Sequence, residues 1–481
     1  MTTAIVWFRR DFRLSDNPAL TEALLTCERV VPLYVHAPEE DGRWAPSSAS
    51  RWWLHHSLRA LDDSLRKRGS CLIIRRGPSL ETLRAIVGQT GAERIYWNRL
   101  YEPELIARDT ETKRALRSDG LIVESSNSAL LHEPWTIKPY KVFTPYWTAV
   151  QRLDLQQTPL PAPKALPPLP ARFETLPPEA LRLLPTIPWD SGLKENWQAG
   201  ENAAQRRLQN FIASALAGYA EKRDRPDYAG TSRLSPHLHF GEIGPRQIVH
   251  AIRIHTGAHE SPTGILKNAE SYLRELVWRE FAHHLLYHFP RTTEYPLDER
   301  FARFPWAAEY TEALTAWRKG MTGFPIVDAG MRELWHSGWM HNRVRMMVAS
   351  FLTKNLRISW LEGARWFWDT LVDADLANNT LGWQWTAGCG ADAAPYFRIF
   401  NPVLQGERFD PNGDYVRRWI PELARLPASH IHRPWQAPSA LLQNSGVDLG
   451  ETYPRPIVDL RISREQALAA FQVIKRIPGA I

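Results

Sequence analysis

The sequence predicts an α/β doubly wound parallel-sheet N-terminal domain followed by an all-α C-terminal domain. Short apolar runs alternate with amphipathic segments over about the first 130 residues, which is typical of a parallel sheet covered by helices. After about residue 197 the apolar residues recur with the 3.6-residue period of helices. We therefore expect an α/β domain over residues 1–132, a proline-rich linker over 133–197 and an all-helical domain over 198–475.

Five strands are expected at residues 4–8, 30–35, 71–74, 94–97 and 121–123. The first helix between them is expected to begin at Asp16, the N-cap before Pro18. The next three helices are expected at 50–68, 79–87 and 103–117. The turn after the first strand, residues 9–14, is basic and contains no glycine. This composition disfavours a nicotinamide dinucleotide site there, because such sites need a glycine-rich turn.

Ten prolines between residues 158 and 188 predict an extended linker with little regular structure. In the second half, apolar periodicity predicts helices at 203–222, 269–288, 331–355 and 361–371. His284 and His288 lie four residues apart on one of these helices, but no glutamate-containing zinc motif accompanies them. No metal site is expected.

The composition places the chain among cytoplasmic proteins with no membrane span. No apolar run is long enough to cross a bilayer, and the N-terminus has no signal-peptide layout. Three scattered cysteines fit a reducing compartment. The net charge of +7 is compatible with a polyanionic partner or with an ordinary basic surface.

The stretch from residue 373 to 385 is the most informative part of the sequence. It contains two carboxylates, two amides and two indoles, a mixture that suits neither a core nor a solvated loop. Such a mixture fits the wall of a pocket for a large, planar, polar cofactor. These side chains are Asp373, Asp375, Asn378, Asn379, Trp383 and Trp385.

Three further groups of residues suggest ligand binding. The hydroxyls of residues 231–235, with Tyr219 nearby, could bind phosphate or form a capped turn. Glu275 and Trp278 share a helix face and suit a stacked base, although a helix salt bridge beside a core tryptophan is the favoured interpretation of that segment alone. Trp339, Asn342 and Arg345 recur at helical spacing, which would place an indole, an amide and a guanidinium on one face.

Together these motifs resemble the photolyase/cryptochrome family. They are Thr-Ser-Arg-Leu-Ser-Pro at 231–236, Trp-Arg-Glu-Phe at 278–281, Trp-Met-His-Asn-Arg-Val-Arg-Met at 339–346 and the 373–385 stretch, with Val-Trp-Phe-Arg-Arg-Asp-Phe-Arg-Leu at 6–14. The resemblance spans nearly the whole chain and is greatest to bacterial class I cyclobutane pyrimidine dimer photolyases. It implies light-driven repair of ultraviolet-damaged DNA by electron transfer from excited, reduced FAD. The alternatives are a blue-light-sensing cryptochrome without repair activity and a (6-4) photoproduct photolyase.

The resemblance implies a set of FAD-binding residues in the helical domain. Asn379 would face flavin N5, where signalling cryptochromes usually carry aspartate or cysteine, so it favours repair. Tyr272 stands where relatives often have tryptophan, and no role is assigned to Asn378. The full set implied is Tyr219, Thr231, Ser232, Arg233, Leu234, Ser235, Tyr272, Arg279, Trp339, Asn342, Arg345, Asp373, Asp375 and Asn379.

The resemblance also implies substrate contacts. Glu275 would hydrogen-bond the dimer bases as a proton donor, in a dry pocket that raises its pKa. Met346 stands where (6-4) enzymes usually carry histidine, which favours cyclobutane dimers. The contacts implied for damaged DNA are Arg223, Glu275, Trp278, Asn342, Arg343, Met346, Trp385 and Arg398.

Three tryptophans match the electron relay of the family: Trp383 nearest the flavin, then Trp360, then Trp306, with Tyr310 as an alternative exit. The α/β domain would hold an antenna chromophore near residues 43–47 and 98–102, with Glu102 as a contact. Methenyltetrahydrofolate is favoured over a deazaflavin. We expect a monomer.

Overall fold

The computed structural model describes residues 1–153, 158–170, 173–257, 263–393 and 397–476. Its sheet contains five parallel strands in the order β3-β2-β1-β4-β5. This order confirms the predicted doubly wound topology. The strands are β1 (Thr3–Phe8), β2 (Arg29–His36), β3 (Ile73–Arg76), β4 (Arg94–Asn98) and β5 (Ile122–Ser126).

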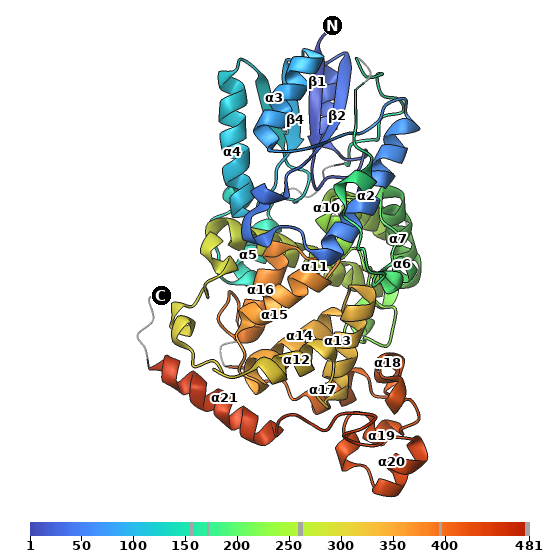
Figure 1. Ribbon diagram of the computed structural model, residues 1–481, viewed down its shortest axis with the longest axis vertical. Helices are drawn as coiled ribbons and strands as arrows, with labels where there is room; N and C mark the ends of the chain where they lie inside the picture. Colours follow the sequence, from blue (N-terminus) through green and yellow to red (C-terminus); the bar gives the residue numbers. More distant parts are fainter. Residues whose placement is uncertain (154–157, 171–172, 258–262, 394–396, 477–481) are drawn as a thin grey trace.

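The sheet forms the upper part of the molecule in Figure 1, with helices on its faces. Every residue of β1 is buried, as expected for a central strand covered on both sides. The first helix is capped by Asn17, whose side chain accepts a hydrogen bond from Leu20 N at 3.1 Å, and not by Asp16 as predicted. Asp16 has a φ of 51° and is buried beside Arg13. The helices here are α1 (Pro18–Thr26), α2 (Ser48–Arg66), α3 (Ser79–Thr90) and α4 (Pro103–Ser118).

After β5, the regular elements of the described chain are all helices, with α11, α15 and α16 at their centre (Figure 1). No helix in the described part of the chain is long and apolar enough to cross a membrane. The helices are α5 (Phe143–Val150), α6 (Ser191–Asn196), α7 (Glu201–Ser214), α8 (Tyr219–Lys222), α9 (Ser235–His239), α10 (Pro245–Gly257), α11 (Thr263–His288), α12 (Thr311–Lys319), α13 (Pro325–Ser337), α14 (Asn342–Ser350), α15 (Trp360–Thr370), α16 (Leu376–Ala387), α17 (Pro402–Phe409), α18 (Asp414–Trp419), α19 (Ala428–Ile431), α20 (Ser439–Ser445) and α21 (Leu460–Lys475).

Two of the predicted helices are interrupted. The segment 203–222 divides into α7, a 3₁₀ turn at Leu216–Gly218 and α8. The segment 331–355 breaks at Gly338, whose φ of 66° ends α13, and continues after α14 as a π-helical turn at Phe351–Asn355. Trp339 therefore lies in the connection before α14. The expectation that Trp339, Asn342 and Arg345 share one helix face was wrong.

Buried polar groups join the sheet region to the helices. Arg13, only 1% exposed, donates hydrogen bonds to the carbonyls of Ser128 and Gly241, each at 2.9 Å. Glu280 on α11 accepts hydrogen bonds from Leu131 N at 2.7 Å and His132 N at 3.3 Å. Because a buried polar group without a partner costs free energy, these contacts fix the relative placement of the two regions.

Glu280 makes folding stability depend on pH. Burial raises its pKa from 4.5 to about 7. The folded protein therefore binds a proton that the unfolded chain has released at intermediate pH, and stability falls as pH rises through this range. We expect the free energy of unfolding to lose about 2.5 kcal/mol between pH 5 and 8 from this group alone, and Glu280→Gln to remove that loss.

Urea unfolding at both pH values, followed by circular dichroism, measures the difference. Glu270→Gln is the matched control, because Glu270 lies on the same helix with its side chain exposed. Equal pH dependence in the Glu280→Gln variant and the unsubstituted protein would contradict the assignment.

Candidate active site

Helix α16 has one closed side and one open side. Leu376, Ala377, Thr380, Trp383 and Gln384 are buried against neighbouring helices. On the other side Asn378 and Gly382 are exposed, and Asn379 and Trp385 are half-buried. A Cβ atom added to Gly382 would meet no other atom within 4 Å. Of the six side chains that the sequence predicted as a pocket wall, Asn378, Asn379 and Trp385 therefore lie on the open side, whereas Asp373, Asp375 and Trp383 are buried.

Asp375 caps α16 and also contacts two histidines. Its Oδ1 accepts hydrogen bonds from the backbone and side-chain nitrogens of Asn378, at 2.9 and 2.7 Å. Its Oδ2 lies 3.5 Å from both His239 Nδ1 and His283 Nε2. Burial opposes the charged form, but the attraction of His283 and the close contacts with both histidines hold the pKa of Asp375 well below its usual value. Asn378, which had no predicted role, is thus a second donor to the capping carboxylate.

Two arginines stand beside this helix in different environments. Arg345 pairs with Asp373 through one nitrogen, Nη2, which donates to both carboxylate oxygens at 2.8 and 3.1 Å. Arg233 lies between the rings of Trp197 and Trp339, at 4.6 and 4.5 Å from their centroids, and its buried Nε has no hydrogen-bond partner in the structure. Burial lowers the pKa of Arg233 to about 10.

The other predicted cofactor residues come from several elements. Thr231, Ser232, Arg233 and Leu234 precede α9, and Ser235 begins it. The Tyr272 hydroxyl lies 3.0 Å from Ser232 Oγ, and its ring lies 5.1 Å from that of Tyr219.

Two predicted members stand apart from this group in their contacts. Asn342 is exposed at the start of α14. Arg279 donates to the Ala129 carbonyl at 2.7 Å, so in this structure it contacts the segment after β5.

This donor set fits FAD. The hydroxyls of 231–235 and the unpaired Nε of Arg233 suit phosphate oxygens, because both can donate hydrogen bonds to them. The open amide-bearing face of α16 suits the polar edge of a flavin ring. Asn379 Nδ2 donates to the Ala364 carbonyl at 3.0 Å, which fixes the orientation of that amide.

Two of the predicted substrate residues, Arg223 and Glu275, pair with each other. Arg223 Nη1 lies 2.5 Å from Glu275 Oε1, and the Glu275 side chain is 30% exposed. The dry pocket expected around Glu275 was therefore wrong for this structure, because solvent and a guanidinium both reach the carboxylate. Trp278 stacks on Phe143, with ring centroids 3.7 Å apart.

The remaining predicted DNA contacts lie nearer the solvent. Met346 and Trp385 are half-buried, and Arg398 is exposed with its guanidinium 4.9 Å from the Phe400 ring centroid. The structure records the burial of these side chains, and their contact with DNA stays a prediction.

Two of the relay tryptophans, Trp360 and Trp383, belong to one buried hydrophobic cluster, and Trp306 and Tyr310 pack against it. Trp383 and Trp360 are 2% and 3% exposed, and Trp306 is partly buried against Phe304. The rings of Phe367 and Trp317 pack against Trp383, with ring centroids 4.9 and 6.2 Å from that of Trp383. Neither residue was predicted from the sequence.

Gly363 makes room for the Trp383 ring. A Cβ atom at Gly363 would lie 2.0 Å from the ring of Trp383. A glycine inside the predicted helix 361–371 was the available signal for this close approach.

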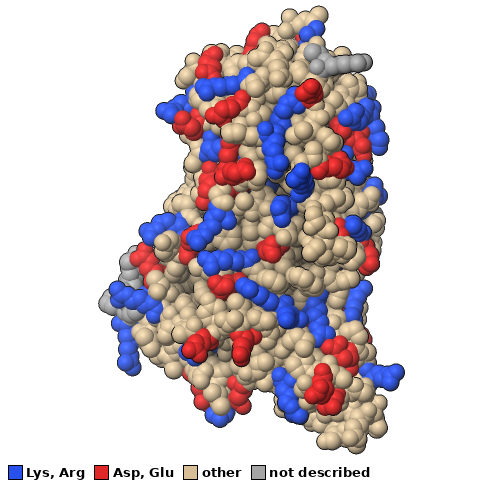
Figure 2. Space-filling model, in the orientation of Figure 1, with Lys and Arg blue, Asp and Glu red and all other residues tan. Residues whose placement is uncertain are grey.

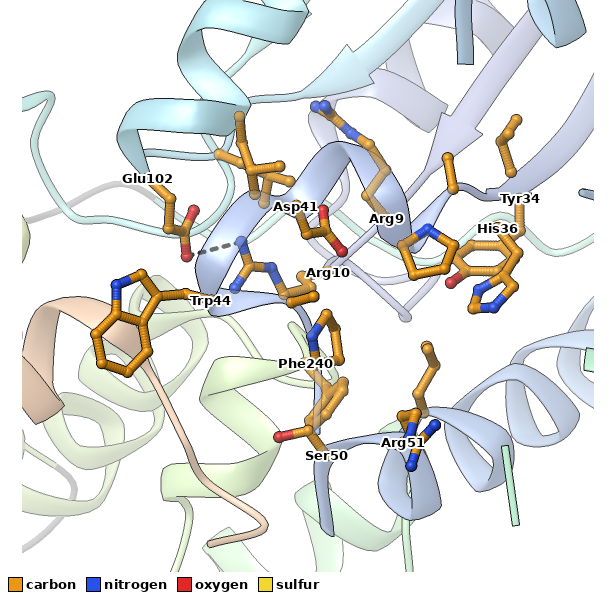
Figure 3. Close-up of a pocket in the computed structure, with 18 of the residues that line it drawn as sticks. Arg9, Arg10, Tyr34, His36, Asp41, Trp44, Ser50, Arg51, Glu102 and Phe240 are labelled. Atoms are coloured by element: carbon orange, nitrogen blue, oxygen red, sulfur yellow. Dashed lines mark ion pairs between the residues drawn. The ribbon is translucent and has the colours of Figure 1, made fainter. Parts of the chain in front are cut away.

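A cavity of about 420 Å³ lies between the sheet and the helices (Figure 3). Arg10 and Glu102 form an ion pair of 2.7 Å in it, and Trp44 stands at its side. The two segments predicted to contact an antenna chromophore both line this cavity. Tyr34, Phe240, Trp368 and Leu376 also line it and were not predicted.

Known proteins match the chain over both regions. Residues 4–164 match the family model described as DNA photolyase, and residues 272–473 match the FAD binding domain of DNA photolyase. The deoxyribodipyrimidine photo-lyase of Agrobacterium fabrum is 47% identical over 480 residues, or 98% of each chain. Cryptochrome-1 of Arabidopsis thaliana is 42% identical over 95% of this chain and 68% of its own.

One solved structure matches the fold closely. A bacterial class III photolyase from Agrobacterium tumefaciens has a TM-score of 0.95 at 46% identity, covering 99% of this chain and 98% of its own. Its class differs from class I, which the motifs resembled most. With these identities over almost the whole length, the chain belongs to the photolyase/cryptochrome family.

Proposed function

We propose that this protein is a deoxyribodipyrimidine photo-lyase that repairs cyclobutane pyrimidine dimers in ultraviolet-damaged DNA. One observation carries the proposal: the open face of α16 presents Asn379 and Trp385 together, so one helix can meet both a flavin and a base. The 47% identity to a protein named deoxyribodipyrimidine photo-lyase supports it. We expect a monomer acting in the cytoplasm.

When bound and reduced, FAD supplies under blue light the electron that opens the cyclobutane ring. The chain holds and orients the cofactor. Arg345 and Asp373 neutralise each other beside α16. Because Asn379 Nδ2 donates to Ala364, its Oδ1 is the atom that can accept from a flavin N–H. No side chain needs to act as a nucleophile.

Substrate recognition requires the dimer to leave the duplex, which is easier for a damaged pair. Trp278 and Trp385 would flank the flipped bases, and Met346 would give an apolar contact that favours cyclobutane dimers over (6-4) photoproducts. Glu275 would first have to exchange its ion pair with Arg223 for the bases. Arg223, Arg343 and Arg398 would bind backbone phosphates.

The similarity to cryptochrome-1 makes light sensing the second candidate function. Asn379 favours repair, since an amide can hydrogen-bond a reduced flavin without titrating. The repair reaction stays the proposal. Class III and class I are both candidate subclasses, because the chain is similar to a class III photolyase.

We assign an antenna chromophore to the cavity between the sheet and the helices. Tyr34 and Trp44 supply aromatic surface, and Arg51, Arg76 and Arg182 are exposed guanidinium groups among its lining residues. Methenyltetrahydrofolate combines a planar ring with carboxylates. This combination matches the aromatic rings and arginines of the lining better than a deazaflavin ring alone does.

The function is tested with purified protein, reductant and a duplex containing one thymine dimer. Blue light should restore the dimer-containing strand, while darkness should not, and a (6-4) duplex should remain unchanged. Added methenyltetrahydrofolate should raise the repair rate under near-ultraviolet light. A reduced, FAD-loaded protein that leaves the dimer intact under light would exclude the repair function and favour the cryptochrome alternative.

Trp383→Phe tests the relay. We expect photoreduction of the oxidised flavin to slow by more than about tenfold, because phenylalanine is much harder to oxidise than indole, while repair by chemically reduced enzyme changes by less than about twofold. Trp317→Phe is the matched control, since Trp317 packs on Trp383 without belonging to the proposed relay. Equal loss of both activities in Trp383→Phe would show that the indole mainly builds the pocket.

A further inference from the structure

Four charged side chains form a continuous chain beside the candidate active site. Glu275 on α11 pairs with Arg223, at 2.5 Å. Arg223 Nε lies 3.9 Å from Asp224 Oδ1, and Arg343 Nη2 on α14 lies 2.7 Å from Asp224 Oδ2. Asp224 therefore uses one oxygen for each arginine. The order Glu275–Arg223–Asp224–Arg343 alternates in sign and has no net charge.

These side chains are partly exposed, from 19% for Arg343 to 37% for Asp224. Solvent and salt therefore reach them, and each pair contributes only about 0.2–1 kcal/mol. A DNA phosphate can displace such partners. Mixed signs are also general on this protein, because Figure 2 shows acidic side chains interspersed among Lys and Arg over the face it displays.

Phosphates must compete with Asp224 for the two guanidinium groups. Undamaged duplex offers only phosphates to this competition, because its bases stay stacked. A flipped dimer also offers its base edges to Glu275. When the Glu275–Arg223 pair opens, Glu275 then binds the bases and Arg223 binds a phosphate, so both gain new partners. Opening the chain of ion pairs is therefore compensated less by undamaged DNA than by damaged DNA.

We propose that Asp224 is a specificity-determining residue, a counter-ion that keeps Arg223 and Arg343 from binding undamaged DNA. This inference rests on the proposed repair function. Asp224 needs no contact with substrate or cofactor to act in this way. It lowers the affinity for phosphates that arrive without a lesion, and it thereby raises the ratio of specific to non-specific binding.

The chain offers a matched control three residues away. Asp227 pairs with Arg225, with contacts of 2.9 and 2.5 Å, and in the described part of the chain it forms no ion pair with Arg223 or Arg343. Asp227→Asn removes the same unit of charge from the same segment as Asp224→Asn. Any difference between the two variants therefore reports the four-residue chain and not the net charge.

The experiment measures binding of FAD-loaded protein in the dark to an undamaged duplex and to the same duplex with one thymine dimer, over a range of salt. Asp224→Asn should tighten binding to undamaged duplex about three- to tenfold near 0.1 M salt and steepen the dependence of log K on log salt by about one. Affinity for the dimer duplex should change less, so the specificity ratio should fall. Asp227→Asn should change either affinity by less than about twofold, and Asp224→Glu should keep the ratio of the unsubstituted protein.

Two outcomes would overturn the inference while the proposed function stands. One is equal effects of Asp224→Asn and Asp227→Asn. The other is weaker binding of Asp224→Asn to undamaged duplex with flavin absorbance unchanged, which would mean that Asp224 positions the arginines for DNA. No preference of the unsubstituted protein for the dimer duplex would instead overturn the proposed function, and the inference with it.

Discussion

The buried carboxylate of Asp375 holds together the elements that form the candidate active site. It is 7% exposed, caps α16 through Asn378, and meets His239 at the end of α9 and His283 on α11. An unpaired charge at this depth would cost several kcal/mol, so the two histidines and the cap stabilise one arrangement of three helices. Asn379, Trp383 and Trp385 all lie on α16 and take their positions from that arrangement.

The same contact brings the cavity between the sheet and the helices close to the candidate active site. His239, which touches Asp375, and Leu376, the next residue of the chain, both line the cavity between the sheet and the helices. Arg10, on the sheet side of that cavity, attracts Asp375 electrostatically while it pairs with Glu102. A chromophore in this cavity would therefore lie directly behind α16, the helix that carries Asn379. Short separation is what energy transfer between two chromophores requires.

Local patterns predicted the elements, and contacts distant in sequence decided what the patterns left open. The apolar runs predicted all five strands, but β3 begins at Ile73 and not at Cys71, because pairing of Leu33 with Ile73 sets the register. Only the structure shows that the Asn378 side chain donates to the capping carboxylate of Asp375. Arg223, the partner of Glu275, lies 52 residues away in the sequence. Gly338 was visible in the sequence, yet apolar periodicity on both sides hid the break between α13 and α14. The cavity combines residues from Trp7 to Leu376, which no spacing could reveal.

The most direct test of this account is the FAD content of purified Asp375→Asn protein. Asparagine caps a helix as well as aspartate does, so the substitution keeps the cap and removes only the charge that meets His239 and His283. The account predicts a clear loss of bound FAD per chain together with a loss of stability of about 3 kcal/mol or more, measured by absorbance and by urea unfolding. Full flavin content with unchanged stability would contradict it, because the carboxylate would then not organise the site.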